Sequence, residues 1–195
     1  MAEGLLNGKV AVVAGGGRGI GRTIALLMAE HGASLVVNDL GVATDGADPS
    51  QTPAGEVVAE IKEHGGSAVA NYDSVSSMKG GENIVQTAVD NYGRLDIVVT
   101  PAGILRDRMV FNMTEEEWDD VIAVHLKGTF TVVKHACILF RQQRRGSVIT
   151  FSSTSGLYGN SGQANYGAAK DGIAGFTRGV ARDMGRYGVR INGIS

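Results

Sequence analysis

Cysteine and proline are scarce in this chain of 195 residues, which has one cysteine and three prolines. A single cysteine excludes an internal disulfide bond and is typical of a protein in a reducing compartment. Cys137 lies in an apolar run with helical spacing, so we expect a buried thiol and not a nucleophile. With few prolines and no G-x-y period, the sequence is neither collagen-like nor of low complexity.

The sequence also lacks a long hydrophobic run and an excess of charge of either sign. No window reaches the ~18 apolar residues of a membrane span, and the first four residues lack the basic and apolar regions of a signal peptide. We therefore expect a cytoplasmic protein with no membrane partner. Because 18 Lys and Arg residues nearly balance 20 Asp and Glu residues, the formal net charge is −2 and no nucleic-acid partner is predicted. No metal site is predicted either.

Glycine, in contrast, is abundant, with 29 residues. That is about twice the average usage of roughly 7%, and it indicates many turns and close backbone approaches. Hydrophobic residues make up 43% of the chain and charged residues 19%, as in a globular protein. The length fits a single domain over residues 1–195, and no repeat or linker divides it.

Short apolar runs rich in β-branched residues alternate with amphipathic stretches of helical length. The predicted strands are Lys9–Ala14, Ser34–Asn38, Ala68–Asn71, Leu95–Thr100, Ser147–Phe151 and Val189–Ile194. The predicted helices are Gly19–His31, Ala54–Glu63, Gly81–Tyr92, a long helix that begins after the capping box at Thr114, and Ala164–Tyr187. Strands that are apolar throughout and separated by helices predict an α/β fold, a doubly wound parallel sheet of the Rossmann type.

The segment Gly41–Pro53 interrupts this alternation. It is rich in Gly, Asp, Ser, Thr and Pro, which is typical of a solvated loop. Two interpretations stay open. The segment is either a surface insertion, or it covers the adenosine end of a cofactor or contacts a neighbouring subunit.

The first predicted strand runs into a glycine-rich turn, and a helix begins there. The turn reads Ala14-Gly15-Gly16-Gly17-Arg18-Gly19-Ile20-Gly21. Glycines let the backbone approach a pyrophosphate, and the helix N-terminus offers N–H groups and a positive dipole end. We therefore assign Gly15, Gly17, Arg18, Gly19, Ile20 and Gly21 to a dinucleotide-binding turn.

Asp39 follows the second strand, about 20 residues after the glycines. A carboxylate there can accept both adenosine ribose hydroxyls and repels a 2′-phosphate, which favours NAD. Arg18 favours NADP instead, because a basic residue beside the glycines attracts that phosphate. A carboxylate that faces a phosphate is directly repulsive, so we predict NAD in preference to NADP.

The strongest signal for catalysis is Tyr166 followed by Lys170, with Ser153 thirteen residues before the tyrosine. Positions i and i+4 share one face of a helix, so the phenol and the ammonium group serve one site. A nearby cation favours the phenolate and brings Tyr166 closer to the range of efficient acid/base catalysis. Ser153 comes just after the fifth strand, where its hydroxyl can donate to a carbonyl oxygen as charge develops there.

These motifs together resemble the short-chain dehydrogenase/reductase family, over about Gly8 to Ser195. The resemblance implies hydride transfer between a nicotinamide cofactor and a carbonyl or secondary alcohol, with Tyr166 as general acid/base and Lys170 also holding the nicotinamide ribose. It places Asp73 beside the adenine ring. It also implies a homodimer or homotetramer, because the helices that carry His125 and Tyr166 commonly pack against a second subunit.

Four positions depart from the family pattern. Ala14 replaces the usual threonine, and Thr100-Pro101-Ala102-Gly103 stands where the family has Asn-Asn-Ala-Gly. Of these, Ala102 and Gly103 are retained and are assigned to the cofactor site. His125 replaces the asparagine that holds a proton-relay water near the lysine; it either substitutes in that relay or is a helix histidine bonded to a backbone carbonyl. Finally, the sequence stops at Ser195, where family members continue, so the C-terminal part is expected to be missing.

A narrower similarity concerns the (3R)-hydroxyacyl-CoA dehydrogenase domain of peroxisomal multifunctional enzymes and bacterial 3-oxoacyl-thioester reductases. It rests on residues 37–41, 70–75, 103–108, 158–160 and 162–166. The implied substrate is a small-molecule 3-oxoacyl or 3-hydroxyacyl thioester of fatty acid metabolism. Arg106 and Arg108 either contact an acyl-carrier phosphate or are solvated loop charges. The alternative to an enzyme is a sensor or scaffold that binds NAD without turnover.

Overall fold

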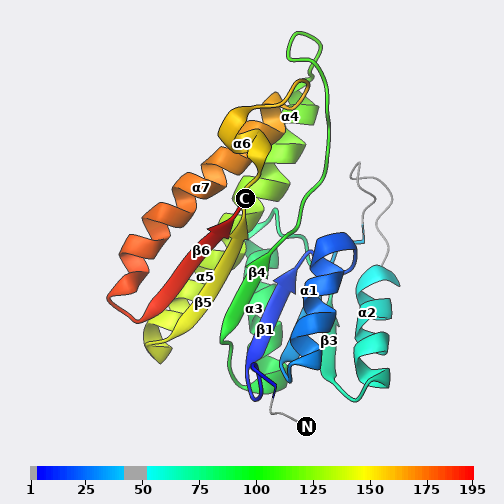
Figure 1. Ribbon diagram of the computed structural model, residues 1–195, viewed down its shortest axis with the longest axis vertical. Coiled ribbons are helices and arrows are strands. Elements are labelled where there is room, and N and C mark those ends of the chain that lie inside the picture. The colour runs from blue at the N-terminus through cyan, green and yellow to red at the C-terminus, as the bar shows by residue number, and fades with distance from the viewer. Residues whose placement is uncertain (1–3, 42–51) are drawn as a thin grey trace.

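The computed structural model describes residues 4–41 and 52–195. All six predicted strands form one parallel sheet in the order β3-β2-β1-β4-β5-β6 (Figure 1). The strands are β1 (Val10–Ala14), β2 (Ser34–Asn38), β3 (Ser67–Asn71), β4 (Ile97–Thr100), β5 (Gly146–Phe151) and β6 (Val189–Ile194). The predicted doubly wound α/β fold is confirmed.

Strand β1 is the topological switch point of this sheet. Its neighbours are β2, with Ala14 opposite Asn38, and β4, with Val12 opposite Val98. The chain winds outward from β1 in both directions, so the connections that leave β1 and β4 diverge at the carboxyl edge of the sheet. A crevice opens at such a point and is the usual ligand site of this architecture.

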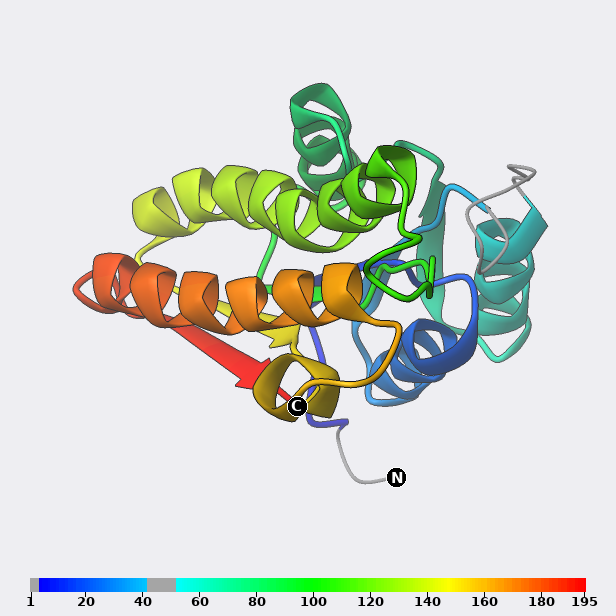
Figure 2. The same cartoon turned by 90° about the horizontal axis from the view of Figure 1, so that it is seen from above.

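Helices cover both faces of the sheet because its strands are apolar on both sides. Val12, Val98 and Val148 pack against α3, α5 and α7. On the other face, Val13 and Leu35 pack against α1 and α2 (Figure 2). The helices are α1 (Gly19–Glu30), α2 (Thr52–Glu63), α3 (Met78–Tyr92), α4 (Glu115–Ile122), α5 (Gly128–Gln143), α6 (Thr154–Tyr158) and α7 (Ala164–Gly185).

The predicted long helix after Thr114 consists of α4, a π-helical turn η1 (Ala123–Lys127) and α5. Its capping box is confirmed: Glu117 N donates to Thr114 Oγ1 at 3.2 Å and Thr114 N to Glu117 Oε2 at 2.9 Å. By length and composition this 29-residue helix would cross a membrane. One face of it, however, packs in the core below the sheet, with Val132, Val133, Ala136 and Phe140 fully buried, as in the core helix of a globular domain.

Most element boundaries lie within one or two residues of the predicted ones, and three differences concern α3, α6 and α2. Helix α3 begins at Met78, three residues earlier than predicted, because Ser77 Oγ caps it by accepting a hydrogen bond from Gly80 N at 2.9 Å. Helix α6 was not predicted. Helix α2 begins at Thr52, so the predicted loop Gly41–Pro53 lies outside the described residues except at its two ends.

Candidate active site

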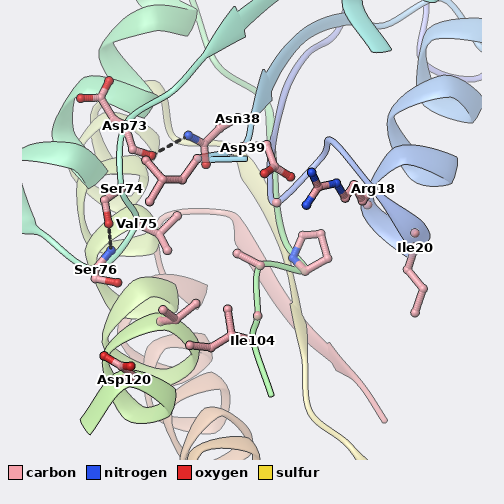
Figure 3. Close-up of a pocket in the computed structure, with 18 residues that line it drawn as sticks. Arg18, Ile20, Asn38, Asp39, Asp73, Ser74, Val75, Ser76, Ile104 and Asp120 are labelled. Atoms are coloured by element: carbon pink, nitrogen blue, oxygen red, sulfur yellow. Dashed lines mark hydrogen bonds between the residues drawn. The ribbon is translucent and has the colours of Figure 1, made fainter. Parts of the chain in front are cut away.

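A cleft of about 440 Å³ lies at the carboxyl edge of the sheet, at the switch point (Figure 3). Four loops and the long helix line it, with the residues Gly15, Arg18, Gly19, Ile20, Gly21, Asn38, Asp39, Leu40, Asp73, Ser74, Val75, Ser76, Pro101, Ala102, Gly103, Ile104, Asp120 and Val124. The structure therefore brings together the residues that the sequence assigned to the cofactor, with Gly17 as the exception among the glycines. Ser153, His125, Tyr166 and Lys170 do not line this cleft.

The glycine turn is packed too closely for side chains. Gly15 has φ +93°, and a Cβ there would stand 2.5 Å from the Ala102 backbone. A Cβ on Gly21 would stand 1.9 Å from the Gly15 carbonyl oxygen. Ala102 N donates to Ala14 O at 2.9 Å, a backbone contact that needs no hydroxyl at residue 14. The turn therefore places backbone without side chains, and the N-terminus of α1, at the cleft. Such an arrangement is suited to binding a pyrophosphate.

Asp39 holds the glycine turn as well as lining the cleft. Its Oδ2 accepts from Gly17 N at 2.9 Å and its Oδ1 from Gly41 N at 2.8 Å. A Cβ on Gly17 would stand 2.7 Å from Oδ2, so Gly17 is required by this contact. Each carboxylate oxygen keeps a further lone pair for a ribose hydroxyl. Arg18 extends on the same side of the cleft (Figure 3).

Asp73 lines the cleft, but its carboxylate turns toward α3 (Figure 3). Its two oxygens accept from Asn71 Nδ2 at 2.8 Å and from Asn83 Nδ2 at 2.9 Å. Asp73 does not cap a helix, because the cap of α3 is Ser77. Sequence reasoning missed the asparagines that surround Asp73.

The predicted catalytic residues lie beyond Ile104, where β5 ends and α7 begins. Ser153 caps α6, and its Oγ accepts from Ser155 N at 3.2 Å. Lys170 is buried, and its Nζ donates to Phe151 O at 2.8 Å and lies 5.5 Å from the centre of the Tyr166 ring. Burial lowers the pKa of Lys170 from 10.5 to about 8, because desolvation disfavours the ammonium form. The i, i+4 pairing thus places a cation against the phenol.

His125 lies in the π-helical turn, edge-on to the Tyr166 ring, with ring centres 5.1 Å apart. Its Nε2 is 2.8 Å from Ile104 O. The same Nε2 is 3.1 Å from Ile104 N, so the ring is bonded to the Ile104 backbone in either tautomer, and the buried Nδ1 has no partner among the described residues. Desolvation first, and the Lys170 cation second, lower the pKa of His125 from 6.5 to about 4, so the ring is neutral near pH 7.

The two sequence-based interpretations of His125 both stay open. Nε2 bonds the Ile104 backbone, as in an ordinary helix histidine, and Nδ1 is buried without a partner among the described residues, near Lys170 and Tyr166. A Cβ on Gly103 would stand 2.2 Å from His125 Cε1. Gly103 is therefore required by the histidine as well as by the cleft.

Arg106 and Arg108 are bound to α4. Arg108 Nε donates to both carboxylate oxygens of Glu117 at 2.6 and 2.9 Å, and Arg106 pairs with Asp120 at 3.3 Å. These ion pairs hold the loop after β4 on the long helix and argue against a carrier-phosphate site. Within residues 4–41 and 52–195, no group of three His, Cys, Asp or Glu side chains is placed to hold a metal.

Comparison with known proteins places this site in a family. The family model described as short chain dehydrogenase matches residues 9–195. The chain belongs to the short-chain dehydrogenase family. This family uses a nicotinamide cofactor, NAD or NADP, which agrees with the glycine turn and its cleft.

Individual short-chain dehydrogenases are similar over nearly the whole chain. A Mycobacterium tuberculosis protein described as a short-chain type dehydrogenase/reductase is 49% identical over 187 residues, and a hydroxyacyl-CoA dehydrogenase of that species is 45% identical over 197 residues. The mouse peroxisomal multifunctional enzyme type 2 is 46% identical over 189 residues. A crystal structure of a short chain dehydrogenase from Mycobacterium avium superposes with a TM-score of 0.92 and 47% identity.

The matches cover most of this chain but less of its relatives. They span 96–97% of this chain and 65%, 61% and 25% of the three relatives in the same order. The Mycobacterium avium structure is matched over 98% of this chain and 71% of its own. The expected similarity to multifunctional enzymes is confirmed.

Proposed function

We propose that the protein is an oxidoreductase that interconverts 3-oxoacyl and 3-hydroxyacyl thioesters with NADH or NAD. The observation that carries this proposal is the buried Lys170 ammonium group against the Tyr166 ring, next to a cleft built for a dinucleotide. A sensor or scaffold has no need of a desolvated cation beside a phenol, so we favour the enzyme.

Tyr166, Lys170 and Ser153 each have one role in the reduction of a carbonyl group. The bound nicotinamide supplies or accepts the hydride. Tyr166 gives a proton to the carbonyl oxygen in reduction and removes it in oxidation, and the Lys170 cation stabilises the phenolate that results. Ser153 donates a hydrogen bond from its hydroxyl to the same oxygen and keeps its proton, because its Oγ otherwise only accepts a 3.2 Å cap hydrogen bond from Ser155 N.

His125 completes the proton path in this proposal. Its unpartnered Nδ1 can bond a water molecule in either tautomer, and we place there a water that also contacts Lys170. Protons then reach Tyr166 through Lys170 and this water without a charged histidine, in agreement with the lowered pKa of His125. The histidine thereby takes the part of the asparagine usual in the family.

The fixed carboxylate of Asp39 supports NAD over NADP. The Asp39 carboxylate stands at the end of β2 and is fixed by two backbone amides, so it cannot easily turn away from a 2′-phosphate. A fixed negative charge there repels the phosphate by direct Coulomb interaction. Arg18 on the same side reduces this repulsion without removing it.

The substrate class rests on the relatives. The hydroxyacyl-CoA dehydrogenase of Mycobacterium tuberculosis is named for a hydroxyacyl-CoA substrate, and it matches 97% of this chain. We extend that class to this chain and place the protein in the cytoplasm, where both cofactor and thioester are available.

We also propose a homodimer or homotetramer formed through the long helix. Side chains at the start of α4 are acidic, with Glu115 and Glu116 exposed, while Arg141 and Arg144 are exposed at the end of α5. Between these ends lie three exposed apolar side chains, Trp118, Phe130 and Ile138. An antiparallel pair of long helices would bury the apolar residues and match opposite charges. Sedimentation as a monomer at micromolar concentration would contradict this.

The test of the activity is turnover of a 3-oxoacyl-CoA with NADH and NADPH in parallel, followed by nicotinamide absorbance and by identification of the 3-hydroxyacyl product. The proposal expects turnover with preference for NADH. Binding of NADH without turnover of the thioester or of other carbonyl compounds would refute the enzymatic proposal.

A further inference from the structure

A chain of buried amide side chains connects the carboxyl ends of β2 and β3 to α3. Asn38 and Asn71 are register partners in these strands, 1% and 7% exposed. Asn38 Nδ2 donates to Asn71 Oδ1 at 2.8 Å, and Asn71 Nδ2 donates to Asp73 Oδ2 at 2.8 Å. Asn83 Nδ2 on α3 donates to the other Asp73 oxygen at 2.9 Å. Buried polar groups are costly unless satisfied, so a fully bonded chain holds its members in one geometry.

This chain of hydrogen bonds is attached to both walls of the cleft. On one side, the Asn38 carbonyl oxygen accepts from Gly15 N and from Gly16 N, each at 2.8 Å. On the other side, Asn38 Nδ2 donates to the backbone carbonyl of Asp73 at 2.9 Å (Figure 3). One residue thus fixes the distance between the glycine turn and the segment 73–76, which lines the opposite wall.

The direction of the donors restricts the part that Asp73 can play. Both carboxylate oxygens are engaged by amides that lie behind the wall, on β3 and α3, and the carboxylate turns away from the cleft. The cleft is lined at this point by Asp73, Ser74, Val75 and Ser76, and the Ser74 hydroxyl accepts a hydrogen bond from Ser76 N at 3.2 Å. Backbone N–H and C=O groups of a fixed loop can bind the edge of an adenine ring.

We propose that Asn38, Asn71 and Asn83 are positioning residues for the adenosine half of the cofactor, and that Asp73 acts as their anchor and not as a direct adenine ligand. The inference rests on the proposed use of a dinucleotide. It adds three asparagines to the residues expected at the cofactor site, and it gives Asp73 a structural role in place of a direct contact with adenine. Tyr166, Lys170 and Ser153, which would serve the nicotinamide half, lie outside this network.

The test exchanges donors and acceptors in the network and measures binding of ADP-ribose by calorimetry. Asn71→Asp sets a carboxylate against the Asp73 carboxylate and removes the donor between them. We expect ADP-ribose to bind about tenfold more weakly or worse, as for loss of a hydrogen bond to a charged group. Adding Asp73→Asn restores a donor–acceptor pair at the same net charge as the wild type, and should return the Kd to within about threefold.

Controls separate positioning from general damage. Asn91→Asp makes the same chemical change on the exposed surface of α3, where Asn91 Nδ2 donates to Thr87 O, and should leave the Kd unchanged. Asn83→Asp places a like charge beside Asp73 at a position that is less buried than Asn71. It should weaken ADP-ribose binding in the same way and replaces Asn71→Asp if that variant does not fold. At saturating NADH the kcat of the folded variants should stay near the wild-type value, whereas KM for NADH rises.

The outcomes are distinct. Wild-type affinity for ADP-ribose in both Asn71→Asp and Asn83→Asp overturns the network proposal. So does a double variant Asn71→Asp/Asp73→Asn that stays as weak as the single variant, because the effect would not come from the donor–acceptor pairing. If the wild-type protein binds neither NADH nor ADP-ribose, the proposed function itself fails, before any variant is compared.

Discussion

Gly103 has no room for a side chain, because His125 occupies the space where a Cβ would stand. The ideal Cβ lies 2.2 Å from His125 Cε1 and 2.9 Å from both ring nitrogens. These distances are far below van der Waals contact, and the ring cannot retreat, since it is buried, held by Ile104 O and packed on Tyr166. Gly103→Ala therefore has to displace the imidazole or the backbone.

The size of the effect follows from overpacking. Forcing one methyl group into a packed core costs about 1–3 kcal/mol, and loss of the hydrogen bond to Ile104 O adds about 1 kcal/mol. For a chain of this length, each kcal/mol corresponds to roughly 2–4 °C in Tm, so the total of about 2–4 kcal/mol predicts a fall of about 4–16 °C. Thermal and denaturant unfolding of the purified protein measure it.

A double-mutant cycle identifies the cause. His125→Ala removes the ring, so Gly103→Ala should cost less than about 1 kcal/mol in that background. The matched control is Gly179→Ala in α7, where a Cβ meets nothing within 4 Å and a helical alanine should be neutral or stabilising. Equal losses from Gly103→Ala with and without His125, or no loss at all, would refute the steric argument.

Two further predictions concern Asp39 and the acid range. Asp39→Ala should weaken NADH binding about tenfold or more and should raise NADPH affinity little, because it leaves the Gly17 and Gly41 amides without their acceptor as well as removing the charge. Fluorescence titration with both cofactors measures the two affinities. Unchanged NADH affinity would contradict the prediction. The folded pKa of His125 is about 4 against 6.5, so its buried neutral ring stabilises the fold above pH 6.5 and that stability is lost as pH falls from 6.5 to 4. Wild-type protein should lose about 3 kcal/mol more than His125→Asn over this window; parallel pH profiles of unfolding would count against a buried neutral histidine.

Sequence patterns predicted the sheet well because burial on both faces demands apolar, β-branched strands such as Val10–Ala14. The glycine turn was equally readable, since each glycine relieves a local clash or a positive φ. Helix α6 was missed because it has five residues, mostly small or polar, and no buried face. Its start depends on a cap by Ser153 Oγ and not on periodicity.

Contacts between distant residues were beyond sequence reasoning. The pairing of Gly103 with His125 and the turn of the Asp73 carboxylate toward Asn83 depend on how helices dock on the sheet. One signal was present for the amide network: Asn38 and Asn71 each end a strand, and carboxyl ends of neighbouring parallel strands meet at one edge. With the strand order known, the contact between Asn38 and Asn71 could have been predicted from the sequence.

The central claim is that Tyr166 moves the proton at the reacting oxygen. The most direct measurement compares Tyr166→Phe with Tyr158→Phe, a nearby tyrosine that is 85% exposed. Our account predicts that Tyr166→Phe binds NADH as the wild type does but loses about 10²–10⁴-fold in kcat, while Tyr158→Phe keeps its activity. Turnover by Tyr166→Phe at the wild-type rate would contradict it.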